Sequence, residues 1–273
     1  MKSPRVIGGF FFMSIYGIIA GRFSKVISSK SDTLERILRF IILGTKRILI
    51  ISYSFSSQIR NLLNGLIDGL EKSGVEVFWE QLNPIAELRF PIGTISATLI
   101  MMMQTFLRKR YPIHPVNQRC FAQWDLIILA GPTWSYNPSG PVLSLLDRDG
   151  KGLFAGKIVL PFISCRGYWR VHYYGLRSLL RRCGAIVAAP IVFSHPTPEP
   201  WRTIGVFLKL AGKVPEAGSS WFHRFYPKYG HSRLQVEDCR KIGFELGKNI
   251  MEGNPLDRPL FPLPVRSEGM DES

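Results

Sequence analysis

Acidic residues are scarce in this sequence. Twenty Asp and Glu stand against 35 Lys and Arg, which gives a formal net charge of +15. Residues 1–50 hold nine Lys/Arg and two acidic residues, so 9 − 2 = +7 of the excess lies there. A basic N-terminal segment suits an anionic membrane surface or, less well, nucleic acid. The other basic residues are scattered and match no nucleic-acid-binding module, so we expect no nucleic-acid partner.

Cysteine and histidine are few and widely spaced. The sequence has neither a C-x-x-C pair nor a Cys/His cluster, which disfavours a zinc site and a disulfide framework and favours a reducing, cytoplasmic compartment. It also lacks the G-x-S-x-G motif of serine hydrolases, and no histidine has an evident nucleophile nearby in the sequence. A hydrolase is therefore not expected. These residues are Cys120, Cys165, Cys183 and Cys239, and His114, His172, His195, His223 and His231.

No apolar run near the N-terminus reaches the roughly 20 residues of a membrane-spanning helix. Residues 6–21 are uncharged and mostly apolar, with Lys2 and Arg5 before them and Arg22 after them. Three alternatives remain open for this stretch: a membrane anchor, marginal or lying in the interface, a helix packed on the domain, or a cleaved signal peptide. Residues 32–43 have the spacing of an amphipathic helix. We treat residues 1–45 as an N-terminal extension that can associate with the inner face of the cytoplasmic membrane.

The rest of the chain alternates strands with helices, which predicts a parallel sheet covered on both faces. After Asp125, residues 126–130 form a continuous apolar run that ends at a glycine, of the kind found in strands buried on both sides. The expected strands are residues 47–52, 75–79, 125–130, 157–165 and 185–193, and the expected helices are residues 59–72, 141–146, 171–183 and 237–250. Pro161 should cause a bulge or bend in its strand.

Three other segments interrupt this alternation. Residues 95–107 form an apolar helix with a three-methionine run, which suits a lid over a ligand, a membrane-contact helix or plain core. The chain is expected to loosen after His195, where prolines and aromatics follow one another. The main domain should end at residue 252, and the proline-rich residues 253–273 should be disordered.

Three loops carry the candidate binding residues. The loop after the first strand is rich in hydroxyls and precedes a helix, where phosphate is favoured, although the same residues could simply cap that helix. The loop after the third strand holds Trp134 and Tyr136, which could equally cap the core. A sheet ordered 2-1-3-4-5 would bring these loops and the one after the fourth strand to one edge, at the switch point where such sheets bind ligands.

This layout resembles the flavodoxin-like flavoproteins, with a three-layer sandwich around a five-stranded parallel sheet. The segments "ISYSFSSQI", "WDLIILAGPTWSYNPSGPV", "ISCRGYW" and "VEDCRKIGFELG" more closely resemble the dialkylresorcinol condensing enzyme-like branch. The resemblance covers roughly residues 47–250, and residues 1–45 have no counterpart in it.

The resemblance implies FMN as cofactor. Ser54, Ser56, Ser57 and Gln58 would surround its phosphate. Trp134 would stack on the isoalloxazine beside Pro132 and Thr133, with Tyr136 on the other face. The ring edge would be lined by Cys165, Arg166, Gly167, Tyr168 and Trp169. Two residues depart from the family: Ser57 replaces a glycine that lets the backbone approach phosphate, and Ile59 replaces a hydroxyl.

The implied function is an NAD(P)H-dependent oxidoreductase that reduces a quinone or aromatic substrate, with the chemistry carried by FMN. Electron-carrier flavodoxins are typically acidic, so the charge disfavours that role. The alternative is an accessory or binding protein of the same fold that has lost FMN and associates with a membrane. A homodimer is a further expectation. The sequence identifies neither a catalytic side chain nor a metal site.

Overall fold

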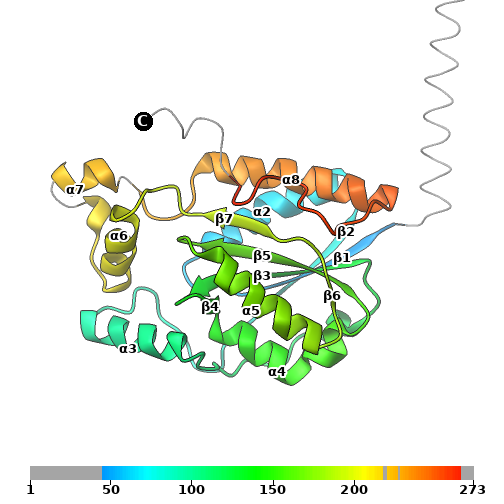
Figure 1. The fold of residues 1–273 in the computed structure, drawn as a ribbon, viewed down its shortest axis with the longest axis horizontal. Coiled ribbons are helices and arrows are strands. Elements are labelled where there is room, and N and C mark those ends of the chain that lie inside the picture. Colours follow the sequence, from blue (N-terminus) through cyan, green and yellow to red (C-terminus); the bar gives the residue numbers. More distant parts are fainter. Residues whose placement is uncertain (1–44, 218–219, 227, 266–273) are drawn as a thin grey trace, which may run out of the picture. The chain divides into compact units, whose positions relative to one another are not determined.

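The computed structural model describes residues 45–217, 220–226 and 228–265 (Figure 1). The expectations for residues 6–21 and 32–43 lie outside the described residues. Within the described part, no helix is long and apolar enough to cross a membrane.

A parallel sheet forms the centre of the domain. It contains β1 (Arg47–Ser52), β2 (Glu76–Gln81), β3 (Leu126–Trp134) and β5 (Ile158–Cys165), followed at one edge by β6 (Ile186–Val187) and β7 (Ile191–Ser194). The order is β2-β1-β3-β5-β6, and β7 also pairs with β5. Since β6 and β7 occupy the position of one strand, this is the predicted 2-1-3-4-5 order of a flavodoxin-like fold, and the prediction of fold class is confirmed.

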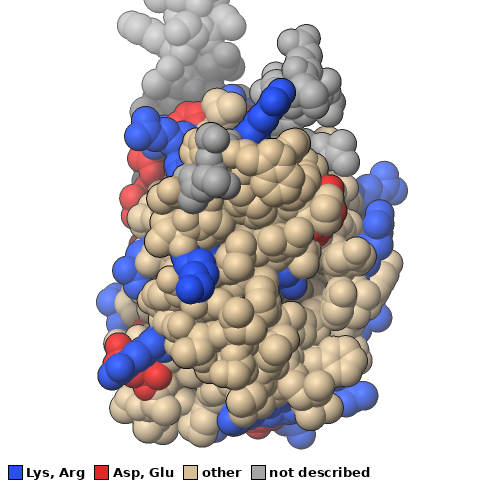
Figure 2. Space-filling view, turned by 90° about the vertical axis from the view of Figure 1, so that its left-hand side faces the viewer, with Lys and Arg blue, Asp and Glu red and all other residues tan. Residues whose placement is uncertain are grey.

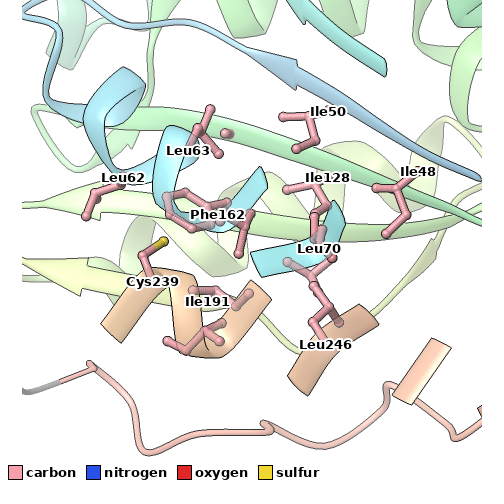
Figure 3. Close-up of a cluster of buried hydrophobic side chains, with 14 of the residues drawn as sticks. Ile48, Ile50, Leu62, Leu63, Leu70, Ile128, Phe162, Ile191, Cys239 and Leu246 are labelled. Atoms are coloured by element: carbon pink, nitrogen blue, oxygen red, sulfur yellow. The ribbon is translucent and has the colours of Figure 1, made fainter. Parts of the chain in front are cut away.

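Helices cover both faces of the sheet, which completes the three layers (Figure 1). The helices α2 (Gln58–Lys72) and α8 (Arg233–Glu252) lie on one face, and α4 (Gly140–Phe154) and α5 (Trp169–Arg182) lie on the other. Side chains of β1 alternate between them: Ile50 packs in the cluster of α2 and α8 (Figure 3), whereas Leu49 packs in the cluster of α4 and α5. This period of two buries the central strands on both sides.

The two helices α2 and α8 approach each other to backbone distance. A Cβ atom added at Gly69 of α2 would lie 2.0 Å from the carbonyl oxygen of Arg240 in α8. One added at Gly243 of α8 would lie 2.2 Å from the carbonyl oxygen of Leu66 in α2. Only glycine fits at these two positions, so the position of α2 is set by α8.

Three helices lie beyond the carboxyl ends of the strands, at the left of Figure 1. They are α3 (Ile95–Phe106), α6 (Trp201–Leu210) and α7 (Ser220–Phe225). The backbone N–H of Ile92 donates to the carbonyl of Leu210 at 2.8 Å, which joins the entry to α3 with the end of α6. The short 3₁₀ helices Gln118–Phe121 and Pro215–Ala217 complete the described structure.

Several predicted boundaries were wrong. The third strand does not end at residue 130 but continues to Trp134 and turns back into β4 (Asn137–Pro138), so the aromatic loop is a hairpin. The helix predicted at residues 141–146 continues to Phe154. The final helix begins at Arg233, because Ser232 and Gln235 form a capping box.

The predicted bulge at Pro161 is absent, because β5 keeps its register with β3 through this residue. The irregularity falls instead on the next strand. The expected strand at residues 185–193 is divided into β6 and β7 around Pro190, which has no N–H to donate to a ladder.

The region after His195 is helical, and the prediction of a loose segment was wrong. Trp201 of α6 stacks on Phe225 of α7, with ring centroids 4.5 Å apart. The expected disorder of the C-terminal segment also differs from the structure over residues 253–265. There, Ala189 N–H donates to Leu256 O at 2.9 Å and Val265 forms a bridge with Phe193. Apolar side chains of this segment pack on the core and order it without regular structure.

Candidate functional site

One cavity lies at the carboxyl ends of the central strands. The structure brings eight of the predicted residues to its wall, from the loops after β1, β3 and β5. They are Ser54, Ser56, Gln58, Pro132, Thr133, Trp134, Cys165 and Arg166. Five predicted residues are not in the wall: Ser57, Tyr136, Gly167, Tyr168 and Trp169.

The loop between β1 and α2 has the features of an anion site. Ser54 Oγ is buried and has no hydrogen-bond partner among the described residues. The N-cap of α2, Ser57, makes no side-chain cap hydrogen bond, and the first turn of α2 has no acidic residue. The N–H groups of this helix end and the Ser54 hydroxyl are therefore available to an anion. Among the described residues that line the cavity, Arg166 is the only Lys, Arg, Asp or Glu.

Ser57 adopts the conformation that a glycine would give this loop. Its φ is +61°, in the left-handed region, where a Cβ atom carries a cost. A serine thus makes the turn for which the sequence comparison above expected a glycine. Ser57 shapes the loop through its backbone, while its neighbours Ser56 and Gln58 reach the cavity.

Residues 229–231 lie across this loop. The Tyr229 hydroxyl donates to Ser56 Oγ at 3.1 Å, and His231 N–H donates to Gln58 Oε1 at 2.9 Å. Gly230 has a φ of +92°, a conformation that residues with a Cβ atom rarely adopt, so the crossing favours a glycine. These contacts fix the side chains of Ser56 and Gln58 at the cavity wall.

Trp134 is held in the cavity wall by aromatic neighbours. Its ring makes edge-to-face contacts with Tyr53, Phe55 and Tyr111, with centroids 5.6, 5.5 and 6.0 Å away. These contacts restrict the rotamer of the indole and leave it in the wall of the cavity. A planar ligand would find a preformed aromatic surface there.

Tyr136 points elsewhere. Ser135 and Tyr136 have φ values of +44° and +69°, which turn the chain at the tip of the hairpin. Tyr136 is 45% exposed and contacts Tyr168, which is 66% exposed, with centroids 5.4 Å apart. The structure does not place either ring against Trp134. Trp169, which we expected in the loop after β5, is the first residue of α5.

The helices α3 and α6 supply walls that the sequence reasoning did not assign. Met101 and Met102 of α3 and Phe207 of α6 line the cavity. Ser135 Oγ donates to the carbonyl of Met102 at 3.0 Å, which ties α3 to the hairpin. The three-methionine run was a signal for α3, and the lid is the alternative that the positions of Met101 and Met102 favour. For α6 no signal was recognised.

A buried hydrogen-bonded chain also reaches the cavity and was missed. Gln235 Oε1 accepts from Ser232 N–H and lies 3.1 Å from His231 Nδ1, so Nδ1 carries the proton. Nε2 of His231 then accepts from the Ser164 hydroxyl at 2.7 Å. Burial lowers the pKa of His231 to about 4, so this histidine is neutral at pH 7.

Two further histidines are buried close to the cavity. Burial lowers the pKa of His172 to about 3, and its Nδ1 lies 2.7 Å from Oγ1 of Thr133, a residue of the cavity wall. Burial, together with the charges of neighbouring groups, lowers the pKa of His195 to about 3. Both rings are uncharged at neutral pH, which leaves Arg166 as the source of positive charge.

Neither a family model nor a curated protein matches the chain. Among solved structures, it is similar to a flavoprotein in complex with FMN from Lactobacillus acidophilus NCFM (19% identity, 54% of this chain and 93% of that chain, TM-score 0.43). It is also similar to a flavodoxin from the domain Archaea (12% identity, 75% of this chain and 98% of that chain, TM-score 0.40). A third similar structure is a flavodoxin, WrbA-like protein from Agrobacterium tumefaciens (12% identity, 76% of this chain and 99% of that chain, TM-score 0.40).

Proposed function

We propose that this protein binds FMN and is an NAD(P)H-dependent reductase of a quinone or another aromatic substrate. The observation that carries the proposal is the buried Ser54 hydroxyl without a described partner. It lies at an uncapped helix N-terminus and shares one cavity with Arg166 and Trp134. Hydroxyl and N–H donors at one part of a cavity and an aromatic surface in its wall suit a phosphate joined to a planar ring.

Each part of the cofactor would have its own residues. Ser54, Ser56 and Gln58 would hold the phosphate, and Trp134 would lie against the ring system. The loop at Cys165 and Arg166 would line the ring edge. When bound, FMN supplies hydride transfer, which no side chain of the protein can perform.

The substrate would lie against the walls that α3 and α6 provide. Met101, Met102 and Phe207 make an apolar and adaptable surface, which favours an aromatic substrate and excludes water. Ser164 and His231 hold a proton at the cavity wall, because the Ser164 hydroxyl donates to a neutral imidazole. With its single proton donated to the imidazole, the Ser164 oxygen can accept a hydrogen bond from a hydroxyl group of the substrate or its product.

Two observations favour the alternative, an accessory protein that has lost FMN. Residues 229–231 bond to Ser56 and Gln58, two groups of the phosphate loop, and Tyr136 lies away from the cavity. In this alternative the loop residues serve to attach residues 229–231 to the sheet.

A flavin titration separates the two. The purified full-length protein is titrated with FMN while flavin absorbance and fluorescence are recorded. Trp134→Ala should weaken binding about tenfold, because stacking contributes on the order of 1 kcal/mol. Ser54→Ala should weaken it by a similar factor through a lost hydrogen bond to a charged group.

Tyr136→Ala is the matched control, since it removes an aromatic ring of the same hairpin outside the cavity, and it should leave binding unchanged. If the parent protein takes up no FMN at tens of micromolar, the accessory-protein alternative stands. If it binds FMN, NADH and NADPH oxidation with quinones as acceptors tests the reductase activity.

A further inference from the structure

The helix α3 has its polar and apolar sides reversed. Its two buried side chains are Thr98 and Thr105, which are 0% and 6% exposed. Five of its large apolar side chains, and that of the residue that follows the helix, are 51% to 70% exposed. They are Ile95, Leu99, Ile100, Met103, Phe106 and Leu107.

These exposed residues recur at helical spacing and form one stripe. Leu99 and Met103 are four residues apart and so lie on the same side of the helix. The helix contains no charged residue. A surface helix of a soluble domain normally turns its polar side to water, so this stripe requires an apolar environment.

The two neighbouring helices also carry exposed apolar side chains. α3 packs beside α6, where Ile204 is 42% exposed, and α6 packs on α7, where Trp221 is 61% exposed. Figure 2 shows this end of the molecule, and most of the surface in view is neither acidic nor basic, with Lys and Arg mainly near its margin. We call the six side chains of residues 95–107, with Ile204 and Trp221, the apolar end face.

The charge around this face is positive. Residues 85–110 and 199–228, which carry α3, α6 and α7, contain nine Lys/Arg and three Glu, so their sum is 9 − 3 = +6. Lys109, Lys213 and Arg224 are exposed. Arg110 pairs with Asp147 at 2.8 Å, which holds one basic side chain at the end of α3.

We propose that the apolar end face docks on an anionic membrane surface. Apolar side chains with an exposed tryptophan and a basic surround match the two attractions of such a surface, namely the apolar interior and the anionic headgroups. A second copy of this chain would bring +6 against +6, which disfavours a symmetric dimer through the same face. The opposite side of α3 carries Met101 and Met102 of the cavity wall, so docking would bring the cavity to the membrane.

A fluorophore on the face tests the proposal in the full-length protein. All four native cysteines are buried, so a thiol-reactive, environment-sensitive dye can be directed to Ile100→Cys. Adding phosphatidylcholine vesicles that contain phosphatidylglycerol should shift the emission to the blue. The same dye at Leu234→Cys, an equally exposed position (58%) on α8, should show no shift.

Sedimentation with the same vesicles measures the strength of docking. The double variant Leu99→Glu with Met103→Glu should bind the vesicles at least about tenfold more weakly than the parent, because two apolar contacts are replaced by anions. The double variant Leu234→Glu with Phe244→Glu on α8 should bind like the parent. Added salt should weaken parent binding.

Three results would overturn the proposal. Sedimentation of the parent without a dye shift at residue 100 would assign binding to the N-terminal segment. A dye shift without vesicles that grows with protein concentration would assign the face to a second copy. Equal binding of the parent and the Leu99/Met103 variant would show that the face does not contribute. None of these readouts depends on FMN, so the proposal stands or fails separately from the proposed function.

Discussion

The hydroxyl of Ser164 lies 2.7 Å from Nε2 of His231, at the end of a chain that begins at Gln235. Burial keeps His231 neutral, and its Nε2 then accepts this hydrogen bond, because Nδ1 carries the proton. His172 and His195 are buried as well, and burial is the first cause of the lowered pKa in all three.

Acid should therefore destabilise the protein well above the pH at which its carboxylates titrate. The pKa values of the three histidines are lowered from about 6.5 to about 3 or 4, so below pH 6.5 the unfolded chain takes up protons that the folded protein does not. The stabilisation of the folded protein by its three neutral histidines is complete above about pH 6.5 and is lost progressively as the pH falls toward 4. Each histidine adds a slope of about 1.4 kcal/mol per pH unit.

Urea unfolding from about pH 7.5 to about pH 5.5 measures this dependence, and three histidines give a slope that approaches about 4 kcal/mol per pH unit. In His231→Gln the slope should fall by about one third, because one titrating group is removed. A free energy of unfolding that stays constant over this range would contradict the assignment of neutral, buried histidines.

Replacing Ser57 by glycine should stabilise the domain. Ser57 has a φ of +61°, and an L-residue pays about 1 kcal/mol for this conformation. Glycine avoids this cost but loses more entropy on folding, so Ser57→Gly should raise the free energy of unfolding by about 0.5 kcal/mol. Ser73, at the other end of α2, has a right-handed conformation (φ −83°). Ser73→Gly is therefore the control and should be destabilising; a loss of stability in Ser57→Gly would contradict the strained loop.

Replacing each of two helical glycines by alanine should change the free energy of unfolding in opposite directions. A Cβ atom at Gly69 would lie 2.0 Å from a backbone oxygen of α8, whereas one at Gly175 meets only the end of the Arg108 side chain, at 3.1 Å. Gly69→Ala should cost about 3 kcal/mol or more through overpacking. Gly175→Ala should gain about 0.5–1 kcal/mol from helix propensity. Thermal unfolding of both variants gives the comparison, and equal effects would show that α2 and α8 can separate without cost.

The sheet and the loop after its first strand could be predicted from the sequence, because a local pattern of residues determines them. Apolar runs that alternate with helical spacing predicted the parallel sheet, because a strand buried on both faces, such as residues 126–130, must be covered by helices. The hydroxyl-rich loop was located because it falls between a strand and a helix. Its residues Ser54, Ser56 and Gln58 do reach the cavity.

The errors arose where distant contacts decide. Tyr136 looked like a second ring for a planar ligand, but the positive φ values at the hairpin tip turn it toward Tyr168. His231 looked isolated because its partner Ser164 is 67 residues away in the sequence. α6 was hidden by prolines before it, and its order comes from aromatic contacts with α7. None of these contacts leaves a local pattern.

The close contact between α2 and α8 has a consequence for synthesis of the chain. The candidate phosphate loop leaves the ribosome early, with α2, but the glycines that accept this helix at backbone distance are near residue 243. Residues 229–231, which fix Ser56 and Gln58, also emerge late. The N-terminal half of the protein therefore cannot complete the candidate site, and a nascent chain acquires that cavity only when nearly all of the domain has been made.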